Sequence, residues 1–203
     1  EKQLEAAVDG FVATSSKIVD DIFKQFIDDI DRKKIVQRQK IDALEKLSLK
    51  GTGALRKLLQ SALMDQYKKS GEIAAAEIFK STFAKPIVAE EFLKILETEN
   101  FNFIKDWEFN VTKNTRMAII QAIKDGKSIA AVVDTLQQVT KGKAAFSVET
   151  YARTKFTEVM NKGRIAFFES TKVVSGYQWS SVIEDRVTEI CRGLHGKRFR
   201  AGD

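Results

Sequence analysis

Residues 8–30, VDGFVATSSKIVDDIFKQFIDDI, decide the fold class because their apolar residues recur at intervals of three and four. That spacing places the apolar residues on one side of an α-helix, in a stripe that faces a protein core. The opposite side is charged and carries Asp20, Asp21, Lys24, Asp28 and Asp31. We therefore expect the stripe to pack against another helix, either of this chain or of a partner. It consists of Val8, Phe11, Val12, Ser15, Val19, Ile22, Phe23, Phe26, Ile27 and Ile30.

The helical pattern extends through most of the chain. It continues through Ile41, Leu44 and Leu47 and should stop at KGTG (50–53), because Gly51 and Gly53 favour a helix end or a turn. Residues 100–110 are aromatic and fit either a loop packed into the core or the start of a helix. Residues 140–147 are expected to form a loop. Helices are predicted over residues 54–69, 72–80, 86–97, 112–125, 129–136 and 148–170.

Three residues suggest where these helices begin and end. Gly126 suits the position after a helix end, and Ser128 suits the N-cap of the next helix. Ser147 is a candidate N-cap for the last long helix. Pro86 suits a first helical turn, where its missing N–H costs nothing.

After residue 172 the pattern changes from helical to alternating. VVSGYQWSSVIED (173–185) predicts a strand with Tyr177, Trp179, Ser181 and Ile183 on one side, and we expect the two aromatic residues to belong to the core. A short helical turn and a second short strand should follow. We therefore predict a mainly α fold, with an elongated multi-helix body and a small C-terminal α+β element. The predicted domains are residues 1–110 and 111–203.

The positive charge of the chain is concentrated in its second half. The net charge is +6, and residues 1–100 carry seventeen basic and seventeen acidic side chains, so the whole surplus follows residue 100. Such an excess attracts polyanions such as nucleic acid, but charge alone favours an ordinary solvated surface. The single Cys excludes an intrachain disulfide and fits a reducing compartment. The apolar runs are too short to span a bilayer, and we expect no signal peptide.

Four motifs follow one another in the second half: GKS (126–128), ARTKFTEVMNKGR (152–164), SGYQW (175–179) and EDRVTEICRGLHGKRF (184–199). Each is weak alone, but the ordered set resembles the phage Mu protein F-like family of minor head proteins, also called phage head morphogenesis proteins. The resemblance covers about residues 115–200, whereas residues 1–100 show no matching motif.

The resemblance assigns structural roles to single residues. In the family, a helix of the form A-R-T-E…N-x-G-R precedes a strand with a Tyr/Trp pair, and D-x-R-T-x-x-x-C-x-x-L-x-G-K-x-F follows. This chain departs from the pattern at Lys155, where an acidic residue is expected, and at Val187, where Thr is common. The positions that fit include Ala152, Arg153, Thr154, Asn161, Gly163, Arg164, Tyr177, Trp179, Asp185, Thr188, Cys191, Leu194, Gly196, Lys197 and Phe199.

The resemblance implies a phage minor head protein that acts in head assembly by binding rather than by catalysis. The implied partners are the portal protein, the major capsid protein and double-stranded DNA bound without sequence preference, with no membrane. The implied location is the capsid interior near the portal, reached from the host cytoplasm during assembly, with several copies in each particle. Residues 1–110 would carry the contacts with partner proteins.

The best candidate functional residues are basic. Lys141, Lys143, Arg192, Lys197, Arg198 and Arg200 would form one DNA-binding patch, although a solvated face is an equally good explanation. Arg153 and Arg164 lie eleven residues apart on one predicted helix and should share a face. We expect both to pair with carboxylates such as Asp185, rather than to bind phosphates.

Cys191 and His195 lie four residues apart, a spacing that suits two metal ligands on one helical face. A structural zinc site needs four ligands, usually Cys and His, and this sequence has one of each. A catalytic pair would need a third group to orient the base, and no spacing identifies one. We therefore expect no catalytic residue, no cofactor and no metal, and interpret the pair as a half-buried thiol and a turn imidazole.

Two other function classes remain open. One is an enzyme, because such domains are sometimes joined to toxin or transferase modules. The other is a helical protein that binds DNA without sequence preference and has no phage role. The gene neighbourhood would distinguish them, since portal and terminase genes alongside would favour the phage role.

The first prediction concerns the metal. We expect the 203-residue chain, purified without chelator, to contain no stoichiometric zinc by elemental analysis. About one zinc per chain, lost in Cys191→Ser or His195→Ala, would contradict this and identify the pair as ligands.

Overall fold

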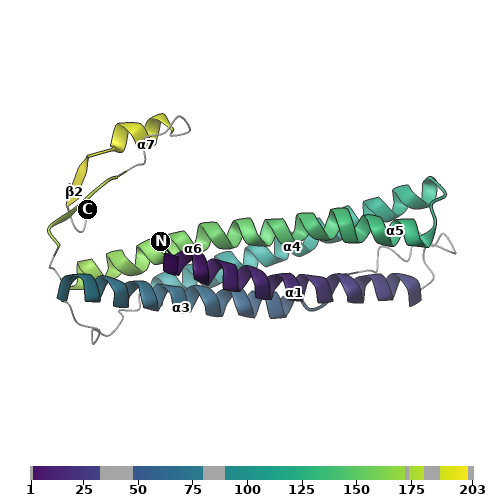
Figure 1. Cartoon of the computed structure of the whole chain (residues 1–203), viewed down its shortest axis with the longest axis horizontal. Helices are drawn as coiled ribbons and strands as arrows, with labels where there is room; N and C mark the ends of the chain where they lie inside the picture. The colour runs from purple at the N-terminus through teal and green to yellow at the C-terminus, as the bar shows by residue number, and fades with distance from the viewer. Residues whose placement is uncertain (1, 33–47, 80–89, 172–173, 181–187, 201–203) are drawn as a thin grey trace. The chain divides into compact units, whose positions relative to one another are not determined.

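The computed structural model describes residues 2–32, 48–79, 90–171, 174–180 and 188–200. They are mainly helical, with a small antiparallel sheet near the C-terminus, as the sequence predicted (Figure 1). The helices are α1 (Lys2–Arg32), α3 (Thr52–Phe79), α4 (Glu90–Lys124), α5 (Ile129–Thr135), the π-helix η1 (Leu136–Lys141), α6 (Gly142–Thr171) and α7 (Glu189–Leu194). The strands are β1 (Gly176–Gln178) and β2 (Arg198–Arg200).

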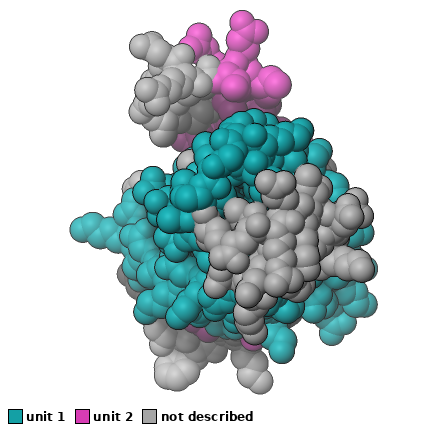
Figure 2. All heavy atoms as spheres, turned by 90° about the vertical axis from the view of Figure 1, so that its right-hand side faces the viewer, with its two compact units in different colours: residues 1–66, 90–159 teal, residues 67–89, 160–203 magenta. Residues whose placement is uncertain are grey.

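The chain divides into two compact units that interleave in sequence (Figure 2). Unit 1 comprises residues 1–66 and 90–159, and unit 2 comprises residues 67–89 and 160–203. Helices α3 and α6 each contribute residues to both units. The predicted division between residues 110 and 111 stays a prediction, and α4 continues as one helix through that position.

The apolar stripe of α1 forms a large part of the unit 1 core, as expected. Phe23 is 1% exposed, and the ring of Phe11 lies 5.7 Å from that of Phe156 on α6. Asp20, Asp21 and Asp28 on the opposite side are exposed. The stripe therefore packs within this chain, and its buried members are Val8, Phe11, Ser15, Val19, Ile22, Phe23, Phe26 and Ile30.

Several predicted helix boundaries are confirmed. Gly51 has a φ of 86°, and α3 begins at the next residue, so the turn predicted at Gly53 is wrong because Gly53 lies inside the helix. Gly126 has a φ of 65° after the end of α4. The Ser128 side chain accepts a hydrogen bond from the backbone N–H of Ala131 and so caps α5. The positions of Ile41, Leu44, Leu47 and Pro86 lie outside the described residues.

The predicted break around residues 70–71 is wrong, because α3 continues through it. The Ser70 hydroxyl donates a hydrogen bond of 2.7 Å to the carbonyl oxygen of Tyr67, one turn earlier. Its polar group is thus satisfied inside the helix and does not end it. Gly71 is buried, so packing of the surrounding chain compensates for its low helix propensity.

Residues 100–110 form neither a loop nor a helix start, because α4 runs through them. Asn100, Ile104 and Trp107 are buried and share one side of the helix. The Trp107 indole N–H donates a hydrogen bond of 3.0 Å to the carbonyl oxygen of Ala144. The aromatic composition, which looked irregular in sequence, thus reflects core packing.

The predicted loop at residues 140–147 is also wrong, because η1 leads directly into α6 and Ser147 lies inside that helix. Leu136, Thr140 and Ala144 are all buried, at intervals of four residues. One turn of a π-helix contains more residues than one turn of an α-helix. The π-segment therefore keeps these three residues on the side that faces the core, whereas a continuous α-helix would gradually rotate them away from it. The π-segment thereby aligns α5 and α6 on one buried side.

Unit 2 depends on a close approach between α3 and α6 at Gly163. A methyl group added at Gly163 would lie 2.5 Å from the carbonyl oxygen of Tyr67 and closer still to the Ser70 hydroxyl. One turn further along α3, Ala74 and Ala75 pack with Phe167. Small residues on both helices therefore bring the two backbones together.

Phe23→Asp should destabilise the fold strongly, because it places an unpaired carboxylate where a ring is 1% exposed. Truncating a buried Phe alone costs roughly 3–5 kcal/mol, and burial of a charge adds to that cost. Thermal melting measures the loss, and Lys24→Asp, next in sequence and exposed, should change stability little. Unchanged melting together with unchanged incorporation into particles would contradict this.

Gly163→Ala should destabilise unit 2, although Ala is the better helix former by about 1 kcal/mol. The reason is the steric overlap with Tyr67 and Ser70. Gly10→Ala in α1, where nothing lies within 4 Å of the added methyl, is the matched control and should stabilise the chain. If melting experiments find that both substitutions are stabilising, α3 and α6 can move apart at Gly163 without a loss of stability, which would contradict this prediction.

Candidate functional site

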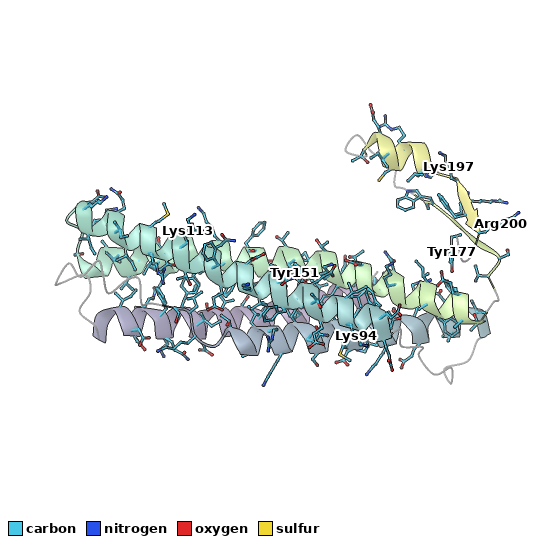
Figure 3. The ribbon with its side chains drawn as sticks, turned by 180° about the vertical axis from the view of Figure 1, so that it is seen from behind. Lys94, Lys113, Tyr151, Tyr177, Lys197 and Arg200 are labelled. Atoms are coloured by element: carbon cyan, nitrogen blue, oxygen red, sulfur yellow. The ribbon has the colours of Figure 1, made fainter. Side chains whose placement is uncertain are left out.

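The candidate site is the basic C-terminal cluster, defined here as Arg192, Lys197, Arg198 and Arg200. Lys197 directly precedes β2, and Arg200 is the last residue of that strand (Figure 3). All four side chains are exposed. Four cations within nine positions give this segment a strongly positive surface.

A short hairpin positions the cluster. β1 and β2 pair antiparallel, with Tyr177 opposite Phe199 and Gln178 opposite Arg198. Beyond the strands, Trp179 N–H donates to the Lys197 carbonyl oxygen at 2.9 Å, and Gly196 N–H donates to the Trp179 carbonyl oxygen at 2.8 Å. Because side chains alternate along a strand, Arg198 and Arg200 project from one face and Phe199 from the other.

Helix α7 carries the fourth cation and Cys191, and His195 follows its last residue. The Thr188 side chain caps the helix by accepting from Cys191 N–H at 3.3 Å, and Arg192 lies in the last turn. Cys191 is partly buried and His195 is exposed. Within the described ranges, no three His, Cys, Asp or Glu side chains are grouped to hold a metal ion.

The six predicted DNA-binding residues are divided between the two units. Lys141 and Lys143 belong to unit 1, and the other four belong to unit 2. Lys141 forms an ion pair of 3.0 Å with Asp20, and Lys143 lines a groove between α4 and α6. A single patch of six residues therefore stays a prediction, and the basic C-terminal cluster is its structurally coherent part.

Arg153 and Arg164 both pair with carboxylates, as expected, but with partners that the sequence did not indicate. Arg153 contacts Glu149 at 2.9 Å and Asp9 at 3.6 Å. Arg164 binds Glu77 through both terminal guanidinium nitrogens, at 3.1 and 2.5 Å. The bidentate pair links α6 to α3 within unit 2. Asp185, the expected partner, lies outside the described residues.

The expectation that both aromatic residues of the hairpin belong to the core is wrong for Trp179, which is 44% exposed. A two-stranded sheet with strands of three residues has too little surface to bury a side chain as large as Trp. Tyr177 is partly buried, 6.5 Å from the Phe168 ring, and burial together with Glu169 raises its pKa. Ser181 and Ile183 lie outside the described residues.

Among the other motif residues, Asn161 is exposed on α6, and Gly196 has a φ of 80° between α7 and β2. That positive φ suits a residue without a side chain, which explains glycine at the turn. No sequence signal predicted the polar cluster around Tyr151 and Lys155 on α6. Lys155 binds both Glu99 and Glu158 at 2.7 Å.

In this polar cluster the single cation of Lys155 pairs with two carboxylates. Burial acts to lower the pKa of Lys155, but hydrogen bonds and charges from Glu158 and Glu99 outweigh it and raise that pKa. Burial raises the pKa of Tyr151 to about 12, so its hydroxyl remains a hydrogen-bond donor at neutral pH. Lys155, which departs from the family pattern, thus acts as an internal counter-ion and stays charged.

Comparison with known proteins agrees with the resemblance seen in sequence. Residues 113–203 match the family model described as phage Mu protein F like protein. No curated protein and no solved structure shows a significant match. No described helix has the length and apolar character needed to cross a membrane. The C-terminal part of this chain, residues 113–203, is thus similar to the phage Mu protein F-like family, a family of phage head morphogenesis and minor head proteins.

Proposed function

We propose that this chain is a phage minor head protein that acts in head assembly, associates with the portal inside the capsid and contacts packaged DNA. The family match over residues 113–203 supports a structural role in the phage head. It also supports capsid proteins as partners and the virion as the location. Under this proposal the function of the chain is binding.

The observation that carries the DNA contact is the exposure of the basic C-terminal cluster. Arg192, Lys197, Arg198 and Arg200 are all exposed. No described residue forms an ion pair with any of the four. Their charges are therefore available to an external anion.

The geometry favours contact with phosphates over reading of bases. β2 is three residues long and α7 is six, so neither presents the extended row of side chains that enters a major groove. Cations on short exposed elements bind the sugar–phosphate backbone, which carries no sequence information. Binding through phosphates releases counterions and therefore weakens as salt rises.

Duplex DNA should bind the full chain weakly and without sequence preference. The affinity should fall with salt by a log–log slope of roughly −0.9 per phosphate contact. Reversing Lys197 and Arg198 to Glu should remove most of the binding and flatten the slope, while circular dichroism shows the helices intact. Fluorescence anisotropy with labelled duplexes of two unrelated sequences measures both effects.

A matched control is the double variant Lys69→Glu/Lys162→Glu, which reverses two exposed cations of unit 2 outside the cluster. It has the same net charge as the test variant and should retain the larger part of the binding. Equal losses in both variants would indicate a general charge effect. Absence of wild-type binding at low salt would leave a role limited to protein partners.

A further inference from the structure

Helix α4 presents an exposed ridge that alternates between cationic and apolar side chains. Lys105, Phe109, Lys113 and Met117 follow one another at intervals of four residues, which places them along one side of the helix. Phe109 is 66% exposed and Met117 is 59% exposed. Lys113 stands on the outer side of α4 (Figure 3). We refer to these four residues as the α4 ridge.

A groove runs along each side of the α4 ridge. One groove, of about 590 Å³, separates α4 from η1 and α6 and has Trp107, Val111 and Ala144 in its lining. The other, of about 600 Å³, is lined by α4 and Ser48 and includes Phe109 and Thr112. Met117 belongs to both grooves. A ridge of side chains between two grooves is the surface that one helix offers to another.

The two charged residues of the α4 ridge itself are cations, whereas the exposed Asp106 lines one of the two grooves beside it. Neither Lys105 nor Lys113 forms an ion pair with any residue that the structure describes. The nearby carboxylate of Glu108 is engaged in a hydrogen bond of 3.1 Å from the Thr52 hydroxyl. Lys105 and Lys113 lie eight residues apart on one side of the helix. Both can therefore pair with carboxylates from outside the described residues.

We propose that the α4 ridge is the docking site for one amphipathic helix of another polypeptide, with carboxylates bordering its apolar face. The ridge is about 18 Å long, which matches a little over three helical turns. Apolar side chains of the partner would enter the two grooves beside Phe109 and Met117. Its carboxylates, about two turns apart, would pair with Lys105 and Lys113.

The described residues of a second copy of this chain do not supply a suitable helix for the α4 ridge. The acidic helix α1 has the charge that the ridge requires, through Asp20, Asp21 and Asp28. Its apolar stripe, however, is already buried in the core of unit 1. The proposal therefore commits to a helix from a different polypeptide, and it stands independently of the DNA contact proposed above.

The test uses the full chain and two synthetic helical peptides of eighteen residues. Both peptides carry Leu at helical spacing on one face. Glu residues border this apolar face in the Glu peptide and Lys residues border it in the Lys peptide, and all other positions are Ala. The Glu peptide should bind with measurable affinity by fluorescence anisotropy, and about two- to thirtyfold more tightly than the Lys peptide, because only the Glu peptide forms the two exposed ion pairs.

Charge reversal provides the decisive variant. Lys105→Glu/Lys113→Glu should exchange the preference, so that the Lys peptide binds more tightly, and Phe109→Ala/Met117→Ala should weaken both peptides. All four side chains are exposed, so melting should not change. Lys94→Glu/Ile95→Ala alters an exposed cation and an exposed apolar residue of the same helix outside the ridge and should leave both affinities unchanged.

Three outcomes would overturn the proposal. The first is no binding of the Glu peptide at millimolar concentration. The second is an equal effect of the control variant at Lys94 and Ile95. The third is self-association of the wild-type chain that the ridge variants abolish, because that result would assign this surface to a second copy. Analytical ultracentrifugation measures the third outcome.

Discussion

The helices of unit 1 depend on one buried amide. Asn100 is 0% exposed. Its side-chain nitrogen donates a hydrogen bond of 2.6 Å to Gln60 on α3, and its oxygen accepts one of 3.0 Å from the Tyr151 hydroxyl on α6. A buried amide without partners costs several kcal/mol, so only one register of the three helices satisfies all these groups. The stacked rings of Phe103 and Tyr151, 3.7 Å apart, follow from that register.

The same constraint determines which side of α4 remains outside. Because Asn100, Ile104 and Trp107 face the core, the side that carries Phe109 and Met117 faces outward. The apolar side chains exposed there are therefore a consequence of satisfying buried polar groups. A surface produced in this way has a fixed geometry before any partner arrives, which lowers the entropic cost of binding.

Unit 2 shows the same combination of a rigid support and an exposed charged surface. The close approach at Gly163 and the bidentate pair between Arg164 and Glu77 join α3 and α6. The hairpin that follows is small and buries little of its own surface, so its cations remain in water. Both candidate surfaces suit binding of large, charged partners, and the basic C-terminal cluster lies within residues 113–203, which are similar to the phage Mu protein F-like family.

Local sequence pattern predicted the mainly helical fold, the stripe of α1, the break at Gly51, the helix end at Gly126, the small C-terminal α+β element and the resemblance of the second half to the phage Mu protein F-like family. These features depend on local periodicity, glycine conformation and motif order, all of which can be recognised in the amino-acid sequence. Tertiary packing instead determines that α3 passes through Ser70 and Gly71, that α4 passes through residues 100–110, and that Trp179 is exposed. It also selected the carboxylate partners of Arg153 and Arg164. In each case the outcome depends on contacts between residues that are distant in sequence, or on how much surface an element can bury. A local sequence pattern contains neither kind of information.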